Sequence, residues 1–245
     1  MSEADQSEVD QHRQALAEPA STLYAAQKVY GEQVRAETRQ CYGRLQDAHL
    51  LIAGVLASAL LRINGKIVPT TDLAEQRSSL LASFVIGVDL CERAIEEGRY
   101  LQASALVRQE LETLAQLHAV AAGRRKEHRS PNMASVTPDL GRLYGDLSAA
   151  AHLSKHSLVR SVSEYEMPPG ELPGPTDGTR YFPALDRDLA RRLFAVHLIV
   201  LVRVIEEMGV DLEERYEREC LTTEEMRALN VAVGLMASEG VVEIG

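Results

Sequence analysis

The chain has no tryptophan and three phenylalanines, and aromatic residues make up 4% of its 245 positions. Strands favour aromatic and β-branched residues, whereas this sequence is rich in leucine and alanine. Such usage is typical of closely packed helices and argues against a β-sandwich or a β-barrel. Because 45% of the residues are hydrophobic, we expect a chain of this length to bury a substantial core.

Cysteine is also scarce. Cys41, Cys91 and Cys220 are far apart in the sequence, and no Cys-x-x-Cys pair occurs. We therefore interpret the cysteines as reduced residues of a cytoplasmic protein. The polar, acidic start of the chain does not resemble a signal peptide. The longest apolar run, residues 50–61, is too short to cross a bilayer, so no membrane association is expected.

Basic residues are in the minority, with 26 Lys and Arg against 36 Asp and Glu and a formal net charge of -10. A surface of this sign repels phosphate backbones, which argues against general affinity for nucleic acid. One basic cluster occurs at Gly123–Arg129 and begins with Arg124 and Arg125. We interpret it as a solvated loop whose cations favour the preceding helix C-terminus. A phosphate or RNA contact is the alternative.

Hydrophobic periodicity predicts an all-α, single-domain helical bundle of about six to eight helices. Residues 1–20 are expected to form a flexible acidic N-terminus and residues 21–245 the bundle. A proline-rich stretch at 158–183 is expected to be an irregular insert or a short hairpin. Helices are predicted at 21–62, from 72 to a break at Gly98, at 99–122, at 138–152 and at 186–208, followed by two shorter ones.

Local start and stop signals support these boundaries. Asp72 with Glu75 resembles a capping box, and Thr137 before Pro138 resembles an N-cap followed by a first-turn proline. Gly209 is expected to end the helix at 186–208, because glycine disfavours a helix interior.

The last helix is expected to open with a capping box formed by Thr222 and Glu225. Apolar residues then recur at the spacing of a coiled-coil seam. The seam consists of Met226, Leu229, Val233 and Met236. We interpret it as a surface for homodimerisation, and a homo-oligomer or a complex with another protein is the expected state.

Two charged residues stand in an alanine-rich band of the helix at 99–122. Arg108 and Glu112 are four residues apart and therefore within reach of each other on one helix face. Because alanine lets another helix approach closely, the pair is expected to be partly buried, as a structural or a functional charge pair. Polar groups also fall on apolar helix faces, where we interpret them as satisfied core residues: Glu110, His118 and His197.

The stretch at 144–152 sets Tyr144, Ser148 and His152 in one row beside an apolar stripe, one residue per helical turn. Ser148 and His152 have the spacing of an activated nucleophile, but the sequence identifies no acid to orient the histidine. His152 and His156 have the spacing of a helical zinc site without the glutamate of His-Glu-x-x-His. Neither a metal site nor a cofactor is therefore expected.

The segments A-L-V-R-Q-E-L-E-T-L and L-Y-G-D-L-S-A-A-A-H resemble an uncharacterised bacterial helical family. That family has an Arg-x-x-x-Glu helix and a later Tyr-x-x-Leu-Ser-x-x-x-His helix, and it is similar to the HEPN bundles of prokaryotic toxin and defence systems. The resemblance covers roughly residues 70–210. It implies a polar spot inside the bundle that gathers Arg108, Glu112, Ser148 and His152, with Tyr144 at its edge.

HEPN ribonucleases carry an arginine followed by a histidine after four to six residues. No arginine stands in that window before His152. The spacing does occur at 44–49 and before His197, but the frequencies of arginine and histidine account for these matches. Both of those histidines lie in very apolar segments, where a base cannot easily reach RNA.

Two functions remain open. The first is a non-enzymatic cytosolic helical module that acts through dimerisation or through binding a partner or a small ligand, with the polar spot as a buried network. The second is a HEPN-like ribonuclease or toxin component, with His152 as general acid or base and Arg108 stabilising phosphate charge. Tyr144, Arg124 and Arg125 are the candidate binding residues. The acidic net charge favours the first function.

Overall fold

The computed structural model describes residues 3–67, 70–125, 133, 138–165, 178–216 and 221–242. These residues contain eight helices and no strand, so the predicted all-α class is confirmed. The helices are α1 (Glu3–Cys41), α2 (Arg44–Ile63), α3 (Asp72–Glu96), α4 (Tyr100–Ala121), α5 (Pro138–Ala151), α6 (His156–Ser163), α7 (Arg187–Tyr216) and α8 (Thr223–Ser238).

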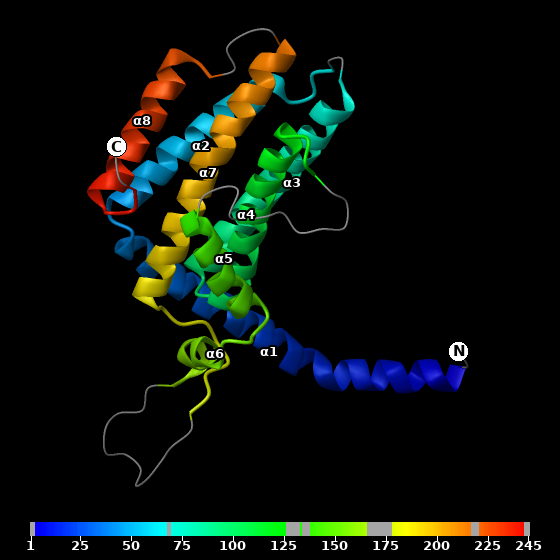
Figure 1. The fold of residues 1–245 in the computed structure, drawn as a ribbon. Coiled ribbons are helices and arrows are strands. Elements are labelled where there is room, and N and C mark those ends of the chain that lie inside the picture. The colour runs from blue at the N-terminus through cyan, green and yellow to red at the C-terminus, as the bar shows by residue number, and fades with distance from the viewer. Residues whose placement is uncertain are drawn as a thin grey trace.

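Helix α7 is the central element of the bundle (Figure 1). It contacts α1, α2, α3 and α4, while α8 packs along α2 and α5 packs along α4. Its segment L-F-A-V-H-L-I-V-L-V is apolar on most sides, and a helix of that kind is stable when neighbours surround it. Leu198, Leu201 and Ile205 are accordingly fully buried.

Helices α3 and α4 form a helical hairpin, which turns at the predicted break, Gly98. The φ angle of Gly98 is +72°, and a Cβ atom there would lie 2.8 Å from the carbonyl oxygen of Ala184. Glycine is therefore required at this turn. The predicted cap of α3 was displaced by one residue, because Thr71, not Asp72, is the N-cap and accepts a hydrogen bond from the Ala74 N–H.

The prediction of one continuous helix over 21–62 was wrong, because the chain turns at Tyr42 and Gly43. Gly43 has a φ angle of +55°, a conformation that favours glycine. Tyr42 is fully buried and stacks on Phe194, with 3.9 Å between the ring centroids. Burial of this ring determines where the chain turns, and the apolar pattern on both sides conceals the break.

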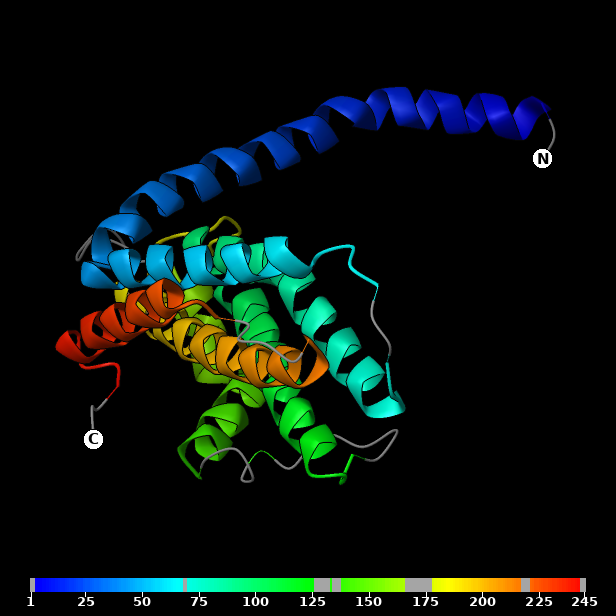
Figure 2. The ribbon, with the colours of Figure 1, turned by 90° about the horizontal axis from the view of Figure 1, so that it is seen from above.

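The N-terminal region expected to be flexible, residues 1–20, belongs to α1 from Glu3 onwards. Pro19 lies inside this helix, and Figure 2 shows that α1 bends as it extends away from the bundle. The buried residues of α1 lie in its C-terminal third and are Gly31, Val34 and Thr38. The preceding part of α1 forms an arm that projects from the body of the molecule.

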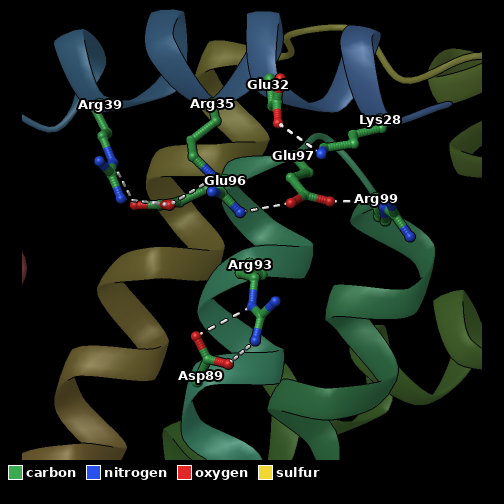
Figure 3. A network of polar contacts seen from close by, with 9 residues as sticks. All are labelled: Lys28, Glu32, Arg35, Arg39, Asp89, Arg93, Glu96, Glu97 and Arg99. Atoms are coloured by element: carbon green, nitrogen blue, oxygen red, sulfur yellow. Dashed lines mark hydrogen bonds and ion pairs between the residues drawn. The ribbon is translucent and has the colours of Figure 1, made fainter. Parts of the chain in front are cut away.

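Ion pairs anchor α1 at the C-terminal end of α3 (Figure 3). Arg39 Nε lies 3.0 Å from Glu96 Oε1, and Arg35 Nη2 lies 2.5 Å from Glu97 Oε1. Carboxylates at a helix C-terminus are disfavoured by the helix dipole, so the two arginines offset an unfavourable charge as well as docking α1.

The prediction that Gly209 ends the central helix was wrong, because α7 continues to Tyr216. A Cβ atom at Gly209 would lie 3.6 Å from the side chain of Leu221, an ordinary contact distance, so Gly209 lies against the chain before α8 in the middle of a continuous helix. In the described part of the chain one helix follows α7, where two were expected. It opens with the predicted capping box of Thr222 and Glu225.

The irregular insert expected at 158–183 begins as helix, since α6 extends to Ser163. An isolated antiparallel bridge joins Glu164 to Thr179, which agrees with the expected short hairpin. Some predictions fall outside the described residues; they concern Thr137, 126–129, 166–177 and Cys220.

The interpretation of the α8 seam as a dimer surface was wrong. Leu229 and Met236 are buried and Val233 is partly buried, because α8 packs on α2. Met226 is 46% exposed and stands alone at the start of the seam. The coiled-coil spacing in α8 therefore serves the bundle itself.

Candidate functional site

Helices α4 and α5 bring together all five residues of the predicted polar spot. Because α5 packs along α4, the row of polar residues on α5 faces the charged pair on α4. We call this group the α4–α5 cluster, and its members are Arg108, Glu112, Tyr144, Ser148 and His152.

Glu112 is the centre of the α4–α5 cluster. Its Oε1 atom accepts hydrogen bonds from Arg108 Nε at 3.2 Å and from the Tyr144 hydroxyl at 2.5 Å. The Arg108 guanidinium also lies 5.8 Å from the centre of the Tyr144 ring. Burial and the Glu112 carboxylate raise the pKa of Tyr144, and Ser148 hydrogen-bonds to the same phenol. The phenol therefore stays protonated and acts as a donor.

His152 joins the cluster through Arg108, whose Nη1 atom lies 3.2 Å from His152 Nε2. A guanidinium can only donate, so Nε2 is the acceptor and the ring proton lies on Nδ1. Among the contacts of the described residues, no side-chain hydrogen bond joins Ser148 to His152, although the His152 N–H donates to the Ser148 carbonyl at 2.9 Å. The serine nucleophile considered from the sequence spacing is therefore not assembled.

The α4–α5 cluster lies at the edge of the bundle and not inside it. The side chains of Arg108 and Glu112 are 24% and 26% exposed, and His152 is exposed. Helix α4 ends at Ala121, about 20 Å along its axis from Arg108, and Arg124 and Arg125 follow this end, where Arg125 Nη1 donates to Gln76 Oε1 of α3 at 3.1 Å. These two arginines therefore do not border the cluster.

A second polar cluster lies at the centre of the bundle, around the fully buried His197 of α7. His197 Nδ1 is 2.8 and 2.9 Å from the two carboxylate oxygens of Glu110 on α4. His197 Nε2 is 3.3 Å from Glu92 Oε1 on α3, and this oxygen is 2.8 Å from His49 Nε2 on α2. With the neighbouring thiol of Cys91 on α3, these residues form what we call the core cluster.

Electrostatics make His197 a cation between two carboxylates. Burial by itself lowers the pKa of His197, but the charge of Glu110 and the surrounding hydrogen bonds raise it well above its usual value. Although burial raises the pKa of Glu92, hydrogen bonds with His197 and His49 bring it down to about 2. Each ring N–H of His197 therefore faces a charged carboxylate.

Cys91 is a neutral thiol in this environment. Burial raises its pKa to about 11, and the hydrogen bond with His197 offsets part of that effect. A reactive cysteine needs a lowered pKa and access to solvent, whereas Cys91 is 1% exposed. The core cluster is therefore not arranged for nucleophilic catalysis by this thiol.

The sequence indicated part of the core cluster. Glu110 and His197 are satisfied buried residues, as interpreted, because they bind each other. His118, by contrast, lies near the surface, with its side chain 31% exposed and its Nε2 atom 3.0 Å from Glu207. The sequence analysis did not identify Glu92 as a member of this cluster. Its position directly after Cys91, a residue on an apolar helix face, was the one signal that could have indicated it.

Two cavities lie apart from both clusters. The larger, about 530 Å³, is lined by apolar residues of α2, α3 and α7, with Lys66 and Asp211 as its charged residues. The smaller, about 310 Å³, lies beside Tyr100 and Arg180. Neither is lined by a residue of the α4–α5 cluster or of the core cluster, so neither supplies a substrate pocket for them.

Helix α2 carries an apolar stripe on its outer side. Among the described residues, α2 is the one helix long and apolar enough to span a membrane by length and composition, and 28% of its most apolar window is buried in the bundle. The core helix of a soluble protein can meet the same criteria. The exposed members of this outer stripe are Leu50 (72% exposed), Gly54, Ala57 and Leu61 (79% exposed).

No protein-family model, no curated protein and no solved structure matches this chain. The resemblance to HEPN-like bundles therefore stays a prediction, and the function has to be argued from the arrangement of the residues.

Proposed function

We propose that the protein is a non-enzymatic, cytoplasmic helical module that works by assembling with a second copy of itself. The observation that carries this proposal is the outer stripe of α2, which leaves two leucines largely exposed. Its residues follow one another at intervals of four, three and four, the spacing of a coiled-coil seam. Contact between apolar side chains and water is unfavourable, and packing a second helix on the stripe would remove these side chains from water.

The order of residues in the stripe suits a second copy. Large residues lie at the two ends of the stripe and small residues in its middle, so the order of side-chain sizes is the same in both chain directions. A two-fold axis through the middle sets Leu50 against Leu61 and Gly54 against Ala57 of the other copy. A two-fold interface must be self-complementary in this way. A Cβ atom at Gly54 would meet nothing within 4 Å, which leaves room for an approaching helix.

The arm of α1 supports the same assembly. It carries exposed apolar residues at every seventh position, namely Val9, Leu16 and Leu23. Tyr30, the next residue in this series, stacks on Phe182 of the same chain, with 4.9 Å between the ring centroids. Figure 2 shows the N-terminal part of the arm extending away from the bundle. An isolated helix gains little stability in water, so packing against the second copy would stabilise the arm.

Light scattering on the purified protein tests the proposal. We expect about twice the chain mass of 26.9 kDa, and we expect Leu61→Glu to reduce it to that of one chain. The matched control is Val231→Glu, because Val231 is a 56% exposed apolar residue on α8 and its substitution should leave the dimer intact. A wild-type monomer at high micromolar concentration contradicts the proposal. The proposal is also contradicted if the wild type binds lipid vesicles and Leu61→Glu abolishes this binding, because the stripe would then face lipid.

A HEPN-like ribonuclease at the α4–α5 cluster is the second candidate. It is favoured by the exposed His152 next to Arg108, since such a pair combines a proton-transfer group with a cation for developing phosphate charge. The first proposal is favoured because Arg108 already occupies His152 Nε2 and because the net charge of the chain is negative. Cleavage of RNA by the wild type, lost in a folded His152→Ala variant, would support this candidate. Two inactive proteins would exclude it.

A further inference from the structure

Three potential metal ligands meet in the core cluster. Cys91 Sγ, a carboxylate oxygen of Glu110 and a ring nitrogen of His197 all lie within 4.8 Å of one another, and Nδ1 is the ring nitrogen next to Glu110. They come from α3, α4 and α7, and their residues are 1%, 6% and 0% exposed. Three donors from three helices therefore surround one point in the middle of the bundle.

The donor set indicates the kind of cation. Zinc binds cysteine sulfur, histidine nitrogen and carboxylate oxygen in four-coordinate sites, whereas calcium and magnesium prefer oxygen alone. A thiolate and a carboxylate also cancel a charge of +2, so an occupied site adds no net charge to the core. We propose that Cys91, Glu110 and His197 bind one divalent cation of the zinc class, which ties α3, α4 and α7 together.

The surroundings of His197 support this assignment independently. A histidine that binds a metal through one ring nitrogen usually donates the other N–H to a carboxylate. Here His197 Nε2 faces Glu92 Oε1 at 3.3 Å, and His49 holds the same oxygen at 2.8 Å. Glu92 and His49 thus orient the ring so that Nδ1 points toward Glu110.

Charge is conserved on binding because one divalent cation replaces two protons. The cation takes the place of the proton on His197 Nδ1 and of the thiol proton of Cys91, and both protons pass to solvent. The outer members of the core cluster reach the surface, since the side chains of Glu92 and His49 are 21% and 23% exposed. Deep burial of the three ligands points to a structural role.

Titration of the chelator-treated protein with Co²⁺ tests the site. We expect one Co²⁺ per chain, a sulfur-to-cobalt charge-transfer band, and loss of the band when Zn²⁺ is added. Cys91→Ser should abolish the band. The matched control is Cys41→Ser, because the Cys41 thiol donates to the Glu37 carbonyl away from the cluster and should not affect the band. A folded wild type without the band, or a band that survives in Cys91→Ser, overturns the proposal.

Thermal unfolding gives a second readout that does not depend on colour. Zn²⁺ should raise the Tm of the wild type and of Cys41→Ser, and it should leave the Tm of Cys91→Ser unchanged. Glu92→Gln keeps all three ligands and should weaken Zn²⁺ binding about 10- to 100-fold. If Zn²⁺ does not change the wild-type Tm, or if Cys91→Ser responds as the wild type does, the proposal is wrong. The mass measured by light scattering is unaffected by this result, so the two proposals can fail separately.

Discussion

Glu110 on α4 and His197 on α7 are 87 residues apart in the sequence and form a buried ion pair, with 2.8 Å between Oε2 and Nδ1. A buried charge that loses its partner costs much more free energy than an exposed one. Any packing of α4 on α7 that separated these two residues would therefore be disfavoured. We infer that the pair helps to select one register between the two helices.

This inference predicts a large difference between two glutamates of α4. In metal-free protein, Glu110→Ala should reduce the free energy of unfolding by up to about 3–5 kcal/mol, because the buried Nδ1–H of His197 would lose its partner and Glu92 alone would remain beside the ring. Glu112→Ala is the control, since the Arg108–Glu112 pair is about a quarter exposed and should contribute about 1 kcal/mol or less. Urea unfolding of both variants measures the difference, and equal losses would refute the inference.

The link between α2 and α8 should depend on pH. Glu225 accepts a hydrogen bond from Arg62 Nη2 at 2.7 Å, and the hydrogen bonds of Arg62 lower the pKa of Glu225 from 4.5 to about 2. The lowered pKa means that ionised Glu225 stabilises the folded state. This contribution is fully present above pH 4.5 and is lost as the pH falls through about 2.

Glu225→Gln removes this titration and is the variant to compare with the wild type. Between pH 5 and pH 2, the wild type should lose up to about 3 kcal/mol more of its unfolding free energy than Glu225→Gln does. Urea unfolding at several pH values measures both profiles. Parallel profiles would show that the ion pair contributes nothing to the pH dependence.

Two glycines should respond to alanine in opposite directions. Gly98→Ala forces a side chain into a positive φ angle and against the Ala184 carbonyl, so a loss on the order of 2–3 kcal/mol is expected. Gly234→Ala lies inside α8 with nothing within 4 Å of the added methyl group, so a gain of about 0.5–1 kcal/mol is expected. Thermal unfolding checks both, and a Tm increase for Gly98→Ala would contradict the described turn.

Local patterns predicted the two halves of the α4–α5 cluster, one on each helix, and the family resemblance implied that they meet. Residues four apart on a helix lie on one face, so the sequence alone set Arg108 beside Glu112 and aligned Tyr144 with His152. Their degree of exposure was not predictable in the same way. It depends on how far α5 covers α4, and that is decided by packing between helices.

The errors at helix ends have a related cause. The turn at Tyr42 lies between two apolar helical stretches, and periodicity does not report a break that preserves the apolar pattern. Gly209 carries a stop signal, yet α7 continues through it to Tyr216, and the Leu221 side chain packs against this point of the helix. In both places a contact with a distant residue accompanies the departure from the local preference.

By itself, the sequence determined that the protein is all-helical, that α7 is apolar on most sides, and that polar groups stand on apolar faces. These properties follow from the periodicity of side chains along one helix. Only the tertiary structure decided which polar groups meet: His197 with Glu110 and Glu92, and Glu92 with His49. Periodicity tells which face of a helix is buried, whereas pairing depends on the order, direction and register in which separate helices pack.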